Sequence, residues 1–160
     1  MVEDLFPGVQ HLQNVHPLLV HFPIAFLVGA ALFYILAWIF PRPSLAMTAF
    51  SLLILGAISA AVAAGTGLYA EEGVMVSRSV RTRLLETHEE LMITTLSLSV
   101  ALTAWAMAAR PFPRKGRVIF MLGFLGLLVV MSLGADFGAR MVYDYNAGGN
   151  ACSQPIDFTK

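Results

Sequence analysis

Four apolar runs, each long enough to cross a lipid bilayer, constrain the fold of this chain more than any other feature. A membrane-spanning helix needs about 20 predominantly apolar residues, within a range of about 17–25. The runs cover about residues 17–40, 45–68, 88–109 and 118–135, and turn-forming or charged residues separate them. None of the runs alternates between apolar and polar residues as a membrane β-strand does. The sequence therefore predicts an all-α fold, an integral membrane four-helix bundle, in one domain of residues 1–160.

The composition agrees with lipid as part of the solvent. Charged residues make up 12% of the chain, whereas soluble domains carry about 25%. The formal net charge is zero, so the chain lacks the basic surface that binds nucleic acid. Its one cysteine, Cys152, cannot form an internal disulfide. A nucleic-acid-binding protein and a disulfide-stabilised fold are therefore excluded.

The third helix has two possible starting points. Residues 87–90 read Thr-His-Glu-Glu, a capping-box pattern that would start the helix at His88, at the edge of the water. Residues 80–86 contain no Gly or Pro, and apolar residues at i, i+3 and i+4 spacing continue through them. This periodicity favours a longer helix that begins near Val80 and carries His88 on its inward face.

The short connections indicate the orientation. Residues 41–44 and 110–117 contain five of the ten Lys and Arg residues and no acid. Basic residues in short loops mark the cytoplasmic side of a membrane. Both termini and the long middle loop are therefore predicted outside, in a multi-pass protein of a bacterial inner membrane.

Three histidines then fall toward the outer side. His16 and His21 are five residues apart, which places them about 140° apart around a helix axis and about 7.5 Å apart along it. They cannot readily bind one ion from the same face. An ionisable residue inside a span needs a partner and marks a candidate functional site. His21 on the first helix and His88 on the third are the predicted pair.

Two imidazoles on facing helices can ligate the iron of a b-type haem. The site requires neutral rings, inward aim and a gap lined by small or apolar residues. His21 and His88 are the expected axial ligands, and His16 is a further candidate. Arginines on the same side are candidates to pair with the haem propionates: Arg81, Arg83 and Arg140.

Two other interpretations of these histidines stay open. His21 and His88 could hydrogen-bond backbone groups or the carboxylates of Glu89 and Glu90. They could instead hold a zinc or copper ion. Neither a Cys–His metal spacing nor an HExxH motif occurs, which argues against a zinc hydrolase. No catalytic residue is assigned, and the sequence leaves enzymatic activity open.

The second run contains two rows of small residues that predict a close helix crossing, because small side chains allow backbones to approach in lipid. A cofactor lying against the glycines is the alternative. The rows are Gly56, Ala60 and Ala64, and Ala57, Ala61 and Gly65.

Residues 16–25, HPLLVHFPIA, resemble the opening signature of a bacterial family of four-span membrane proteins known as domain of unknown function 2231. The resemblance covers nearly the whole chain and implies a histidine entering the third span and a Gly-rich close after the fourth. Members often end with a Val-Tyr-x-His-Gly-like segment, and here Tyr145 stands where that histidine would be. The resemblance therefore does not support a second haem with His16 as its partner. Haem binding rests on the residues and not on the family.

The sequence predicts a cytochrome b-like membrane subunit that holds haem b near the outer face and passes electrons between quinol and a carrier. Its partners would be the lipid bilayer and other membrane or redox subunits. The alternative is a non-catalytic structural or assembly subunit of a larger membrane complex, in which bulky residues at Gly56 or Ala60 would disrupt association. No role is assigned to Cys152 or to the tail around it.

Overall fold

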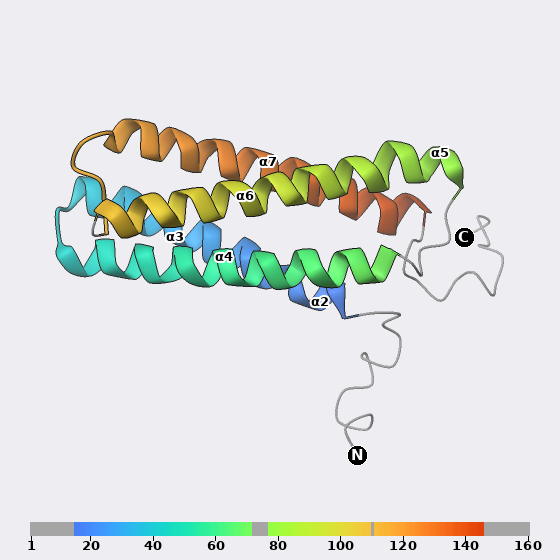
Figure 1. The fold of residues 1–160 in the computed structure, drawn as a ribbon, viewed down its shortest axis with the longest axis horizontal. Coiled ribbons are helices and arrows are strands. Elements are labelled where there is room, and N and C mark those ends of the chain that lie inside the picture. The colour runs from blue at the N-terminus through green and yellow to red at the C-terminus, as the bar shows by residue number, and fades with distance from the viewer. Residues whose placement is uncertain (1–14, 72–76, 110, 146–160) are drawn as a thin grey trace, which may run out of the picture.

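The computed structural model describes residues 15–71, 77–109 and 111–145, which form helices joined by short connections and contain no β-strand. Figure 1 shows the helices packed lengthwise into one bundle. In chain order they are α2 (His16–Leu19), α3 (His21–Ile39), α4 (Pro43–Glu71), α5 (Arg78–Val80), η2 (Arg81–Leu85), α6 (Glu86–Ala109) and α7 (Arg117–Tyr145).

Four helical segments are long and apolar enough to cross a membrane: His16–Ile39, Pro43–Glu71, Arg78–Ala109 and Arg117–Tyr145. The prediction of an all-α, four-span membrane bundle is confirmed. The segments run alternately in opposite directions, so the first and last described residues lie at the same end of the bundle (Figure 1). The third segment begins at Arg78, as the longer of the two predicted helices requires, and the fourth continues to Tyr145 instead of ending near residue 135.

The first span is interrupted near its start. Helix α2 ends at Leu19 and α3 begins at His21, with Val20 between them. Pro23 has no N–H to donate to the carbonyl of Leu19, which loosens the first turn of a helix. The short helix α2 packs against α4, so the direction of the His16 side chain depends on this break.

The third span contains a turn wider than an α-helical one. The Glu86 N–H donates to the carbonyl of Arg81, five residues back, and residues 81–85 form the π-helical segment η2. One extra residue in a turn changes which side chains share a face, and such segments are frequent at functional sites. Here Leu84 and Leu85 are both buried against Met141 of α7.

A cluster of aromatic rings fills one end of the bundle. Tyr34 is fully buried, and its hydroxyl donates to the carbonyl of Pro111 at 3.1 Å. Its ring centroid lies 5.0 Å from that of Phe112, 5.0 Å from that of Phe120 and 5.4 Å from that of Phe124. Aromatic pairs at these distances add about 0.5–1.5 kcal/mol beyond their burial. This end is tightly closed.

Helices α3 and α4 meet through the predicted small residues. A Cβ atom on Gly56 would lie 2.6 Å from Cδ2 of Leu27, which is fully buried. Ala60 is also buried, whereas Ala61 and Gly65 face outward. Both residues therefore pack inside this chain, and the expected effect of bulky residues at Gly56 or Ala60 on association with other subunits stays a prediction.

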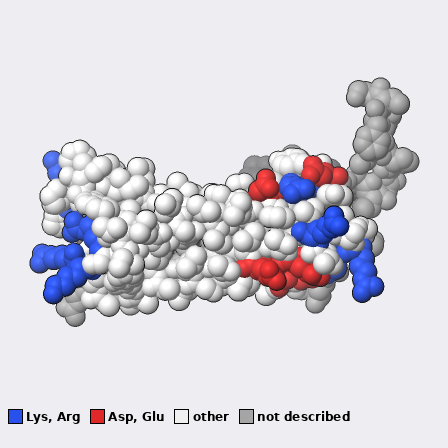
Figure 2. All heavy atoms as spheres, turned by 90° about the horizontal axis from the view of Figure 1, so that it is seen from above, with Lys and Arg blue, Asp and Glu red and all other residues white. Residues whose placement is uncertain are grey.

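Charged side chains gather at the two ends of the bundle and leave an uncharged belt between them (Figure 2). One end carries only basic groups, and the other carries acidic and basic groups together. The basic end holds the short connections with Arg42, Arg114, Lys115 and Arg117. The uncharged belt is what the hydrocarbon core of a bilayer requires, because an unpaired charge there is costly.

Candidate functional site

A cavity of about 440 Å³ opens between the helices at the end away from the aromatic cluster. Its volume falls within the range of about 300–1,000 Å³ that is typical of small-molecule and cofactor sites. Most lining side chains are apolar, and three histidines line it: His16, His21 and His88. The predicted ligands therefore border one space.

His88 is held by α7. Its Nδ1 atom lies 2.7 Å from the carbonyl oxygen of Gly134. A carbonyl only accepts hydrogen bonds, so Nδ1 carries the proton and Nε2 carries the lone pair. The ring also lies against Gly138, where an added Cβ would be 2.9 Å from Cε1 of His88. A hydrogen bond from one ring nitrogen orients the ring and leaves the other in the form that ligates a metal.

His16 is held by α4 in a similar way. Its Nδ1 atom lies 3.2 Å from Oγ1 of Thr66, and that hydroxyl donates to the carbonyl of Val62 at 3.1 Å or of Ala63 at 3.0 Å. Because the hydroxyl hydrogen is directed to the backbone, the oxygen accepts from Nδ1–H of His16. An added Cβ on Gly67 would lie 3.0 Å from Cε1 of His16.

His16 and His88 are the two imidazoles that hydrogen-bond to neighbouring helices, and both line the cavity. The side chain of His21 lines the same cavity but is exposed. The break at Val20 places His16 on α2 and His21 on α3, so the direction of each ring is set separately. The predicted pairing of His21 with His88 stays a prediction, because both side chains line the cavity.

Two residues that position the rings were not predicted. Thr66 bonds His16 and Gly138 lies under His88. A threonine within an otherwise small and apolar run was the available signal for the first. The i, i+4 spacing of Gly134 and Gly138 was the signal for the second.

The three arginines do not line the histidine cavity. Arg81 forms an ion pair with Glu71 at 2.5 Å, and Glu71 itself borders the cavity. Arg83 and Arg140 line a separate pocket between η2 and α7. Assigning Arg83 and Arg140 to the same site as the histidines is therefore corrected.

The other interpretations of the histidines are constrained by the same geometry. The partner of His88 is a backbone carbonyl of α7, and not the carboxylate of Glu89 or Glu90. Within residues 15–71, 77–109 and 111–145, no three His, Cys, Asp or Glu side chains are grouped so that they could hold a metal ion. Zinc takes three or four protein ligands, so the pair of imidazoles does not resemble a zinc site.

A Gly138→Ala substitution should lower the stability of the protein, because the new Cβ would lie 2.9 Å from Cε1 of His88 and 3.1 Å from Nδ1. The ring must shift, and the loss of its bond to Gly134 costs about 1 kcal/mol. Gly126→Ala on the same helix is the control, since nothing lies within 4 Å of its Cβ position. Thermal unfolding in detergent should show a lower midpoint for Gly138→Ala only; equal midpoints would contradict the close contact.

Comparison with protein families supports the resemblance noted in the sequence. A family model described as a predicted membrane protein, DUF2231, matches residues 12–151. No curated protein and no solved structure matches the chain. The match spans all four helical segments, including both helices that carry the paired histidines. The chain therefore belongs to the DUF2231 family of membrane proteins.

Proposed function

We propose that this protein is a membrane subunit that binds a b-type haem through His16 and His88 and passes electrons between quinol and a carrier. The observation that carries the proposal is that two imidazoles at one cavity are held in the same way, each by a neighbouring helix. Each ring lies against a glycine, and each Nδ1 is engaged by a neighbouring helix. For His88 this leaves Nε2 in the basic form, which is the form that ligates iron.

The ligand number favours haem over a bare ion. In haem the porphyrin surrounds the iron, and the protein supplies only axial ligands. Two imidazoles are sufficient for that purpose. The lining of the cavity supports the same choice, because it is mainly apolar. A flat, hydrophobic cofactor suits such a space.

A bound haem would supply one-electron chemistry, while the protein supplies orientation and surroundings. Thr66 and the carbonyl of Gly134 hold the proton on Nδ1 of each histidine. Lipid-soluble quinol is the proposed reductant because the bundle is embedded in the bilayer.

The proposed location is near the outer face of a bacterial inner membrane. The lining of the cavity includes Glu71 and Glu89. Figure 2 shows that one end of the bundle carries both acidic and basic groups, and these glutamates belong to that end. The opposite end carries only basic groups, in short connections, which is typical of a cytoplasmic face. An electron carrier on the outer side would therefore approach the end at which the histidines lie.

An absorbance spectrum of the purified protein, expressed with haem supplied, tests the proposal. We expect a Soret band, sharpened α and β bands on reduction, and about one iron per chain by metal analysis on the same sample. A protein that shows no Soret band under these conditions would contradict haem binding. The remaining alternative is a structural subunit, for which the relevant observation is an outward row of small residues on α6: Ser97, Ala101, Ala104 and Ala108.

A further inference from the structure

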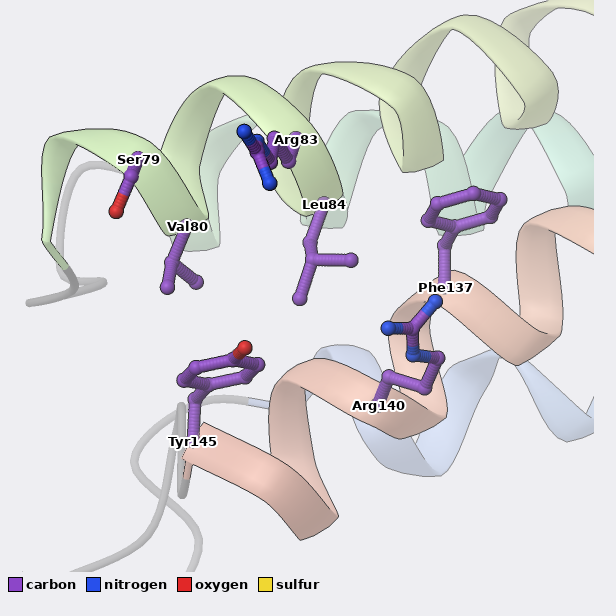
Figure 3. A pocket seen from close by; sticks show the side chains of 7 residues that line it. All are labelled: Ser79, Val80, Arg83, Leu84, Phe137, Arg140 and Tyr145. Atoms are coloured by element: carbon purple, nitrogen blue, oxygen red, sulfur yellow. The ribbon is translucent and has the colours of Figure 1, made fainter.

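A second pocket, distinct from the histidine cavity, lies between η2 and α7 near the end of the bundle. Its volume is about 280 Å³, just below the range of about 300–1,000 Å³ typical of drug-sized ligands. Figure 3 shows Leu84 pointing from the upper helix toward α7 and Tyr145 pointing back toward it. The pocket is therefore suited to a small group, with the remainder of a larger ligand outside.

The polar lining is basic. Arg83 comes from η2 and Arg140 from α7, and the hydroxyl groups of Ser79 and Tyr145 complete the polar set. Among the described residues that line the pocket, none is acidic. Two guanidinium groups on two different helices thus border one small space.

Both guanidinium groups are available to bind an anionic ligand. Arg140 pairs with Asp144 one turn along α7 at 3.7 Å, and both side chains are about half exposed (49% and 54%). Exposed pairs of this kind are weak, so a ligand with more negative charge would replace Asp144. Within the described part of the chain, no hydrogen bond or ion pair of Arg83 is found.

The remaining lining is apolar and leads toward the membrane interior. Val80, Leu84 and Phe137 line the pocket. Leu133 lies one turn further along α7 from Phe137 and is 50% exposed on the lipid-facing surface. Along α7 the order from the helix end inward is therefore hydroxyl, guanidinium, aromatic ring and aliphatic side chain. Water, headgroup and acyl chains follow the same order in a lipid leaflet.

We infer that this pocket binds the phosphate of an anionic phospholipid, with its acyl chain lying along Phe137 and Leu133. Guanidinium groups recognise phosphate through paired, charge-assisted hydrogen bonds. Basic pockets between membrane helices are suited to lipid headgroups. An anionic lipid is the proposed ligand, because two guanidinium groups border the pocket and the carboxylate of Asp144 pairs with Arg140 only weakly. This site does not depend on the presence of haem.

Native mass spectrometry of the detergent-purified full chain tests this inference. Phosphatidylglycerol and phosphatidylcholine with identical acyl chains are titrated separately, and we expect phosphatidylglycerol to bind about tenfold more tightly. Arg83→Gln and Arg140→Gln should each weaken its binding by about tenfold, which corresponds to about 1.4 kcal/mol. Arg78→Gln is the matched control, since Arg78 is exposed, lies on the adjacent α5 and does not line the pocket.

Three results would overturn the inference. The first is equal affinity of the wild-type protein for the two lipids. The second is a loss of phosphatidylglycerol binding in Arg78→Gln as large as that in Arg83→Gln. The third is binding of inorganic phosphate as tight as that of phosphatidylglycerol, which would indicate a site for free phosphate. Arg83→Lys, which keeps the charge but loses the planar fork, should retain part of the preference, and circular dichroism checks that each variant is folded.

Discussion

Replacing His88 or His16 with Ala should abolish the Soret band of the haem-supplied protein, whereas His21→Ala should leave it in place. His88 and His16 are the two imidazoles whose Nδ1 atoms are engaged by α7 and α4. His21 borders the same cavity with an exposed side chain. Removing an axial ligand takes away a bond that holds the iron, which weakens haem binding. The measurement is Soret absorbance and iron content per mole of protein.

The three histidine variants serve as controls for one another, because each replaces one histidine of the same cavity with alanine. Circular dichroism should show the same helical content for all of them. If His21→Ala loses the band and His16→Ala keeps it, the iron is ligated by His21 and His88, and the arrangement around His16 has another role. Retention of the band in His88→Ala would contradict a site that uses either pair.

The second large effect is expected at the crossing of α3 and α4. Gly56→Leu should destabilise the fold by about 3 kcal/mol, the upper part of the usual range for overpacking a core. The Cβ alone would lie 2.6 Å from Cδ2 and 2.8 Å from Cγ of Leu27. Leu27 has no room to withdraw, because it is fully buried. Close backbone approach is a main source of helix association in lipid, so the two helices must separate.

Gly65→Leu is the matched control for this substitution. Gly65 lies on the same helix, and nothing is found within 4 Å of its Cβ position. Thermal or detergent-induced unfolding followed by circular dichroism should show a lower midpoint for Gly56→Leu and little change for Gly65→Leu. A similar loss in both variants would mean that leucine disturbs α4 itself and not its contact with α3.

Much of the architecture could be predicted because it depends on properties of the linear chain. In lipid every backbone polar group must be paired within the segment, so a long apolar run becomes a helix. The early start of the third helix also followed from the sequence, since no Gly or Pro interrupts residues 80–86. The close crossing at Gly56 followed from the spacing of small residues.

The pairing of the histidines could not be predicted in the same way. His16 and His21 lie on opposite sides of the break between α2 and α3. Which of them faces the cavity interior depends on how the short helix α2 packs against α4. That contact involves Thr66 and Gly67, about fifty residues further along the chain. Helical spacing alone predicts the angle between the two histidines. It does not predict which of them points into the bundle.

The arginines were misplaced for a related reason. The wide turn of residues 81–85 inserts one residue into the helix, and one residue corresponds to a rotation of about 100°. Arg81 therefore meets Glu71, while Arg83 borders the pocket shared with Arg140. An unbroken α-helix through this segment would orient these side chains differently.

The sequence by itself determined the number of spans, the uneven distribution of charge between their ends and the residue types available as ligands. Each of these follows from local composition and from the cost of unpaired polar groups in lipid. Only the tertiary structure decided that α4 and α7 hold His16 and His88 at one cavity and that Arg83 and Arg140 line another pocket. These positions depend on the direction in which each side chain points from its helix. That direction is set by the break after α2, by the wide turn in η2 and by the contacts between helices.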